Sequence, residues 1–107
     1  MTNNVERHKE LVEQIHETYL AKNGDYGDSF NKSLNKYGMI SAIVRMNDKF
    51  ERIDNLRLSD ARVGDETVID SLLDLANYAI MTAMWIEEER WVEEYKINPF
   101  DGFFGNN

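Results

Sequence analysis

Residues 65–94 predict a helix that is apolar on two opposite sides. One side carries Ile69, Leu72, Leu73, Ala76, Ile80 and Ala83, and the other carries Val68, Leu75, Ala79 and Ile86. A helix that is apolar nearly all round its circumference must be buried on several sides. We therefore expect an all-α bundle in which this helix has neighbours on both sides.

Apolar residues at helical spacing predict two further helices, over residues 4–21 and 38–56. Asn3 or Asn4 is the expected N-cap of the first. The second carries apolar residues at alternating spacings of four and three: Met39, Ile43, Met46, Phe50 and Ile53. Three helices seldom bury one of their number on two sides, so we expect a fourth partner. It is either a short helix from the C-terminal segment or, as we favour, helices of a second subunit, which complete the bundle by oligomerisation.

Two segments of the chain lack a helical period. Residues 22–30, with Gly24 and Gly27, predict a structured loop that can extend to Tyr37 and contain a helical turn. Residues 98–107 hold three phenylalanines and predict an irregular tail, either docked on a neighbouring surface or disordered. The sequence shows no linker and no internal repeat, so we expect residues 1–107 to form a single domain.

Composition excludes several classes of protein. The chain is 42% hydrophobic, enough for a core, and its lack of cysteine excludes a disulfide framework, a thiolate zinc site and a cysteine nucleophile. We find no secretory signal and no membrane span, so we expect a cytoplasmic protein. A net charge of −8 repels polyanions, which argues against duplex nucleic acid as a partner. A small phosphorylated ligand stays possible, because a metal ion inverts the charge of an acidic pocket.

A polar stripe runs along the helix predicted over residues 65–94. It comprises Glu66, Asp70, Asp74 and Asn77, which fall within a sector of about 80° beside the apolar face. Charges there are costly unless they are paired or bound to a metal, and no lysine or arginine lies between positions 65 and 86. The stripe indicates a ligand or metal site, and the alternative is a solvated charged face.

The helix predicted over residues 38–56 carries a second acidic pair. Asp48 and Glu51 are three positions apart, flanked by Arg45 and Arg52. Two such helices facing each other would form an all-oxygen site suited to Mg²⁺, with Lys49 and Arg52 placed to bind phosphate. The alternative is that these side chains form ordinary salt bridges with one another.

Three motifs in order resemble the family called nucleotide modification associated domain 1, which is common in bacteriophages and also found in bacteria. The resemblance covers residues 22–84. The first motif holds Lys22, Asn23, Asp25, Tyr26, Gly27, Asp28, Ser29 and Phe30. The second holds Arg45, Asp48, Lys49, Phe50, Arg52 and Leu56. The third holds Asp65, Glu66, Asp70, Leu72, Asp74, Leu75, Ala76, Asn77 and Tyr78.

The family in turn resembles the MazG-type all-α nucleoside triphosphate pyrophosphatases, which bind Mg²⁺ with two acidic pairs, each spaced by three. Asp48 and Glu51 match the first pair in spacing, with Asp48 in place of the usual glutamate. Glu66 and Asp70 depart from the second pair, because they are four positions apart. The resemblance therefore implies a nucleotide ligand more firmly than it implies hydrolysis.

The resemblance implies an enzyme that cleaves a nucleoside triphosphate between its α and β phosphates. Its metal ligands would be Asp48, Glu51, Glu66 and Asp70, with Lys22, Lys49 and Arg52 neutralising phosphate charge. Tyr26 or Phe30 would contact the base and Asn77 the base or sugar, with further ligand contacts from Asp25, Ser29, Arg45 and Asp74. The first alternative is a module that binds a nucleotide or nucleotide signal without cleaving it, and the second is a purely structural bundle. Residues 22–30 would be a lid over the ligand, or would plug the end of the bundle with Tyr26 and Phe30.

Overall fold

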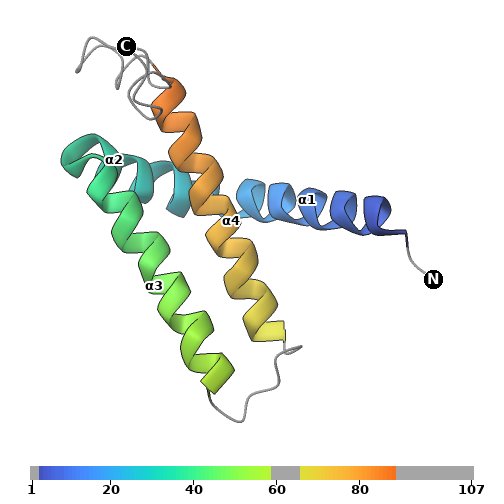
Figure 1. Ribbon diagram of the computed structural model, residues 1–107. Coiled ribbons are helices and arrows are strands. Elements are labelled where there is room, and N and C mark those ends of the chain that lie inside the picture. Colours follow the sequence, from blue (N-terminus) through green and yellow to red (C-terminus); the bar gives the residue numbers. More distant parts are fainter. Residues whose placement is uncertain (1–2, 59–65, 89–107) are drawn as a thin grey trace, which may run out of the picture.

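The computed structural model describes residues 3–58 and 66–88, except for the side chains of Asp25, Glu66 and Thr67. Within these residues the secondary structure is helical, with no strand (Figure 1). Its elements, in order, are α1 (Asn4–Ala21), the π-helix η1 (Gly24–Phe30), α2 (Asn31–Tyr37), α3 (Met39–Leu58) and α4 (Glu66–Glu87). The predicted all-α fold class is confirmed.

The three long helices follow the predicted ranges closely. α1 has the predicted bounds, and the Asn3 side chain caps it by accepting a hydrogen bond from the Val5 amide at 2.7 Å. α3 begins directly after Gly38, whose φ of 76° is a conformation that glycine adopts at little cost. α4 ends at Glu87, and Glu88 is already outside the helix. The prediction that this helix continues to residue 94 is therefore wrong from residue 88 on. Residues 89–94 and the predicted tail lie outside the described residues.

The segment 22–37 differs from the predicted loop, because η1 and α2 make nearly all of it helical. Tyr26, Phe30 and Leu34 follow one another at spacings of four and are 4%, 2% and 1% exposed. Burial of these three side chains outweighs the weak helix propensity of the glycines. A Cβ atom at Gly27 would lie 2.9 Å from the Asn23 side-chain oxygen, so a larger residue here would require the exposed Asn23 side chain to move.

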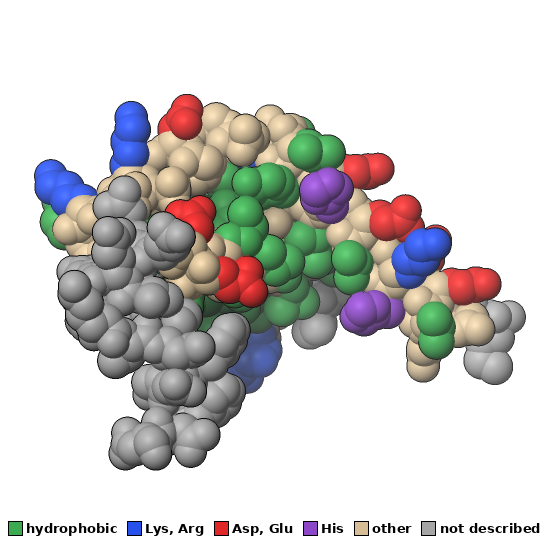
Figure 2. All heavy atoms as spheres, turned by 90° about the horizontal axis from the view of Figure 1, so that it is seen from above, with side chains coloured by type: hydrophobic (Ala, Val, Ile, Leu, Met, Phe, Trp, Pro, Cys, Tyr) green, Lys and Arg blue, Asp and Glu red, His purple; other side chains and the backbone are tan. Residues whose placement is uncertain are grey.

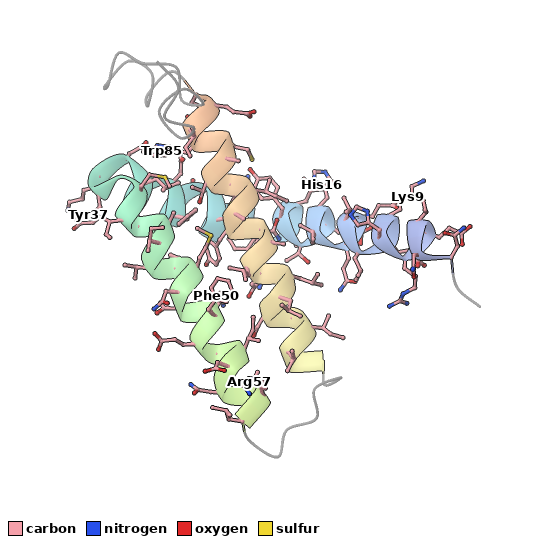
Figure 3. All side chains as sticks on the ribbon, in the orientation of Figure 1. Lys9, His16, Tyr37, Phe50, Arg57 and Trp85 are labelled. Carbon is pink, nitrogen blue, oxygen red and sulfur yellow. The ribbon has the colours of Figure 1, made fainter. Side chains whose placement is uncertain are left out.

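The core lies where η1, α2 and the C-terminal half of α4 meet. α3 and α4 lie side by side and antiparallel, and α2 packs across one end of the pair (Figure 1). Trp85 points from α4 towards α2 and its indole N–H donates to Asn35 Oδ1 at 3.0 Å (Figure 3). The core residues are Tyr26, Phe30, Leu34, Ala42, Tyr78, Met81, Trp85 and Ile86.

Much apolar surface stays uncovered within the described residues. α1 projects away from the α3–α4 pair and buries none of its residues (Figure 1). In Figure 2, hydrophobic side chains gather where α1 leaves the body of the molecule, and acidic side chains follow α1 outwards. On α4, Val68 and Ile86 of one predicted side are buried, although Ala79 of that side is exposed, whereas Ile69, Leu72 and Ile80 on the other side are 42–49% exposed. The described part of one chain thus covers one side of α4, and the expected neighbour on the other side, supplied by oligomerisation, stays a prediction.

No helix in residues 3–58 and 66–88 has both the length and the apolar character needed to cross a bilayer.

Candidate functional site

The carboxylate of Asp74 joins three elements of the fold. The Tyr26 hydroxyl of η1 donates a hydrogen bond to Oδ1 at 2.9 Å, and Lys49 Nζ of α3 forms an ion pair with Oδ2 at 3.2 Å. Both charged side chains are about three-quarters buried, at 26% exposed for Lys49 and 23% for Asp74. Three residues that the sequence predicts for the site are therefore in direct contact.

The Tyr26 hydroxyl is held in its neutral form. Burial raises its pKa above the ordinary value near 10, and the hydrogen bond and negative charge of Asp74 raise it further. The hydroxyl consequently stays a hydrogen-bond donor to Asp74 throughout the physiological pH range.

The members of the α4 polar stripe have different environments. Asn77 is 2% exposed, and its amide donates to the Ile15 carbonyl at 3.1 Å, which holds α1 against α4. Asp70 is exposed, and the Glu66 side chain lies outside the described residues. Two of the four residues thus hold helices together, and Asp70 faces solvent.

The second acidic pair, Asp48 and Glu51, lies in an open depression on α3. Asp48, Glu51, Arg52, Asn55 and Leu56 line it. Glu51 Oε2 accepts a hydrogen bond from the Asn47 amide at 2.8 Å. Neither Asp48 nor Glu51 forms an ion pair with any residue in the described part of the chain, where the ion pairs are Lys49–Asp74 and Arg57–Asp54. The salt bridges of the alternative prediction are therefore not formed here.

The Lys49–Asp74 contact fixes the register of the antiparallel helices. One turn further along α3 lies Arg52, and one turn back along α4 lies Asp70, so these two residues are at the same level of the pair. Arg45, one turn back along α3 from Lys49, is half-buried. Among these basic residues, Lys49 is the one that contacts α4 directly.

Exposed carboxylates one turn apart suit a divalent cation that prefers oxygen ligands. Asp48 and Glu51 fit this requirement, since neither is neutralised by a described lysine or arginine. Among the residues whose side chains are described, no three carboxylates or histidines come close enough together to share a metal ion. Of the four predicted metal ligands, Asp48 and Glu51 thus lie together on α3 and Asp70 lies on α4. The side chain of the fourth, Glu66, lies outside the described residues.

The residues predicted from segment 22–30 divide between core and surface. Phe30 packs edge-to-face on Tyr78, with ring centroids 4.9 Å apart, and Tyr26 does the same at 5.6 Å. Lys22 and Ser29 are exposed, and the Asp25 side chain lies outside the described residues. This packing of the two rings is what the plug alternative predicts.

A small cavity lies beside the Tyr26 ring. It has a volume of about 120 Å³, and its lining includes Tyr19, Phe30, Met81 and Trp85. Ligand pockets usually exceed about 300 Å³, so this cavity would have to widen to admit a nucleobase.

Two amides belong with the α3 site although the sequence analysis gave them no role there. Asn47 binds Glu51, and Asn55 lines the depression. Their signal is the spacing of four that puts Asn47, Glu51 and Asn55 on one side of the helix.

The comparisons with known proteins give one match. The family described as nucleotide modification associated domain 1 matches residues 22–86, which span η1, α2, α3 and α4 up to Ile86 and leave out α1. No curated protein and no solved structure matches. Because the match spans more than half of the chain and holds the Tyr26–Asp74–Lys49 contacts and the α3 depression, the chain belongs to the nucleotide modification associated domain 1 family.

Proposed function

We propose that this protein binds a nucleoside triphosphate together with Mg²⁺ at the α3 depression and hydrolyses it between the α and β phosphates. The observation that carries the proposal is the exposed pair Asp48 and Glu51, which lies beside Arg52 and has no described ion pair. The family's association with nucleotide modification supports a nucleotide as the ligand. The activity would serve nucleotide metabolism or DNA base modification in a bacteriophage or bacterium.

Each side chain has a definite part in the proposed site. Asp48 and Glu51 would hold Mg²⁺, with Asp70 and Glu66 of α4 completing the ligand set as in MazG-type pyrophosphatases. When bound, Mg²⁺ would neutralise phosphate charge and orient the attacking water. Arg52 would bind phosphate oxygens. The Asn47 amide donates a hydrogen bond to Glu51, and Asp74 holds Lys49 through its ion pair.

A second candidate function is binding of a nucleotide or nucleotide-derived signal without hydrolysis. The Lys49–Asp74 ion pair favours this candidate, since it engages a cation that hydrolysis would need at the phosphates. The spacing of four between Glu66 and Asp70 favours it too, as it departs from that of the metal-binding pairs. Such a protein would sequester its ligand, as in phage counter-defence.

Incubation with a panel of nucleoside triphosphates and Mg²⁺, followed by chromatography, tests both candidates. Release of nucleoside monophosphate and pyrophosphate supports hydrolysis, and unchanged nucleotide recovered from denatured protein supports binding alone. In either case Glu51→Gln should weaken the interaction, whereas Asp54→Asn is the matched control, because Asp54 is exposed on α3 but lies outside the depression. If the chromatography finds no products and the protein holds no nucleotide, both candidates are contradicted.

A further inference from the structure

The small cavity beside the Tyr26 ring is lined almost entirely by aromatic and apolar side chains. It lies between the end of α1, η1 and the last turns of α4. Its lining includes Tyr19, Tyr26, Phe30, Met81, Met84 and Trp85. We call this space the aromatic cavity.

The aromatic cavity has a buried inner wall and an exposed mouth. Phe30, Trp85 and Tyr26 are 2%, 3% and 4% exposed. Met84, in contrast, is 43% exposed, and the two polar residues of the lining that are exposed, Asn31 and Glu88, also lie at its edge. A group that enters past these exposed residues therefore reaches an apolar space within the core.

The volume of the aromatic cavity matches one six-membered ring. An apolar cavity of about 150 Å³ can stay free of water and bind a benzene molecule. The aromatic cavity has about 120 Å³, and part of its lining is methionine, whose flexible side chain adapts to what it contacts. It is thus close to the size of a phenyl group, but smaller than a two-ring indole needs.

The chain itself continues from the mouth of this cavity. Glu88 lines the cavity and is the last described residue, so residue 89 begins at its edge. Phe100, Phe103 and Phe104 follow twelve to sixteen positions later, in a segment whose one charged residue is Asp101. A group tethered by so short a connection has an effective concentration in about the millimolar range, and closing a loop of this length costs little extra entropy. The tether favours the chain's own segment over a partner in solution.

The chemistry of the cavity distinguishes among the aromatic residues after Glu88. Trp91 has a two-ring side chain, which exceeds the cavity volume. The hydroxyl of Tyr95 would need a hydrogen-bond partner once buried. A phenylalanine ring meets both conditions, since it has one ring and no polar atom.

We propose that one phenylalanine ring of residues 98–107 fills the aromatic cavity of the same chain. The ring packs against Tyr26 and Trp85 and closes the open side of the core. It thereby supports the Tyr26 ring, whose hydroxyl binds Asp74. This inference does not depend on the proposed function.

Methionine methyl resonances of the full chain, measured by NMR, test the proposal. Met81 and Met84 line the cavity, whereas Met39 and Met46 pack against the core without lining it. An aromatic ring shifts the resonances of methyl groups beside it. Loss of the ring should therefore shift the resonances of Met81 and Met84 and leave those of Met39 and Met46 in place.

The variant that removes the ring replaces Phe100, Phe103 and Phe104 together by alanine, and single replacements then identify the ring. Deletion of residues 98–107 should have the same effect as this triple variant. Trp91→Ala and Tyr95→Ala are the matched controls, because each removes an aromatic side chain outside residues 98–107. Circular dichroism checks that all variants keep their helices.

Added benzene tests whether the cavity is filled in the parent. In the triple variant the vacated cavity should bind benzene, with a saturable shift of the Met81 and Met84 resonances. In the parent the phenylalanine ring already fills the space, so benzene should cause no such shift.

A mixed sample tests whether the ring comes from the same chain. The triple variant, labelled at its methionine methyl groups, is refolded together with the unlabelled parent. The labelled resonances should stay at their positions in the triple variant, because each parent tail fills its own cavity.

Four results would overturn the proposal. The first is an equal response of parent and triple variant to benzene, since the cavity would then be open in the full chain. The second is a shift of the Met81 and Met84 resonances in Trp91→Ala or Tyr95→Ala but not in the triple variant. The third is recovery of the parent resonances in the mixed sample, which would mean that a second copy supplies the ring. The fourth is a triple variant that neither shifts these resonances nor binds benzene, because no ring would then enter the cavity.

Discussion

The acidic residues of α4 and of α3 look alike in sequence but lie in different environments. Asp74 of α4 is 23% exposed, and both of its oxygens have partners, the Tyr26 hydroxyl and the Lys49 ammonium. Asp48 of α3 is exposed and has no ion pair among the described residues. The acidic residues of the two helices are therefore of two kinds: Asp74 joins elements of the fold, and Asp48 stays available to a cation.

Replacing Asp74 should have the largest effect on stability. Asp74→Ala leaves the buried Tyr26 hydroxyl and the largely buried Lys49 ammonium without their acceptor, and should lower the free energy of unfolding by about 2–3 kcal/mol. Asp48→Ala should change it by less than about 0.5 kcal/mol, as expected for an exposed side chain. Urea unfolding of both variants measures the difference, and equal losses would contradict the division between the two carboxylates.

Magnesium should act on the α3 pair and not on Asp74. At a tenfold excess over its dissociation constant, Mg²⁺ should stabilise the parent by about 1.4 kcal/mol, because it binds the folded state alone. The double variant Asp48→Asn, Glu51→Gln should lose this gain, whereas Asp74→Asn should retain it. Thermal unfolding with and without Mg²⁺ measures the gain. Retention in the double variant would show that the metal binds elsewhere.

The Tyr26 hydroxyl should contribute less than Asp74 does. Tyr26→Phe keeps the buried ring and removes one hydrogen bond, so the free energy of unfolding should fall by about 1 kcal/mol. A loss as large as that of Asp74→Ala would mean that the hydroxyl, rather than the ion pair with Lys49, supplies most of the stabilisation. Urea unfolding at neutral pH measures it.

The same substitution should change how stability depends on alkaline pH. The pKa of Tyr26 is raised in the folded protein, so its stabilisation is complete below the unfolded value of about 10. Above that pH the unfolded chain loses the proton first, and stability falls as pH rises. Comparing parent and Tyr26→Phe at about pH 9 and about pH 11 isolates this slope from the other tyrosines. An equal slope in both proteins would contradict the assignment.

The exposed ion pair of α3 should have the smallest effect. Arg57 and Asp54 meet at 2.6 Å, but their side chains are 61% and 57% exposed. Arg57→Ala should therefore lower the free energy of unfolding by no more than about 0.5 kcal/mol, and added salt should make this loss smaller. Urea unfolding at low and high salt measures both effects. A loss comparable with that of Asp74→Ala would show that burial does not separate the two ion pairs.

The helical spacing of apolar residues predicted the long helices correctly, because each of them has at least one apolar side whose burial is favourable. The same period failed at residues 22–37, where Gly24, Gly27 and several polar residues hide the spacing of Tyr26, Phe30 and Leu34. Their burial depends on Tyr78 and Trp85, which lie far away in sequence on α4. Local pattern predicts a helix where the pattern is strong, and long-range packing decides where it is weak.

By itself the sequence determined the all-α class, the start of each long helix to within a residue and the two apolar sides of α4, since these follow from periodicity along one segment. It also placed Asp48 and Glu51 on one side of one helix. Only the tertiary structure decided that Asp74 meets Tyr26 and Lys49, that Asn77 holds α1, and that the side of α4 with Val68 faces inwards. The physical reason is that a carboxylate's role depends on the cations and donors around it, and here those partners lie 25 and 48 positions away along the chain.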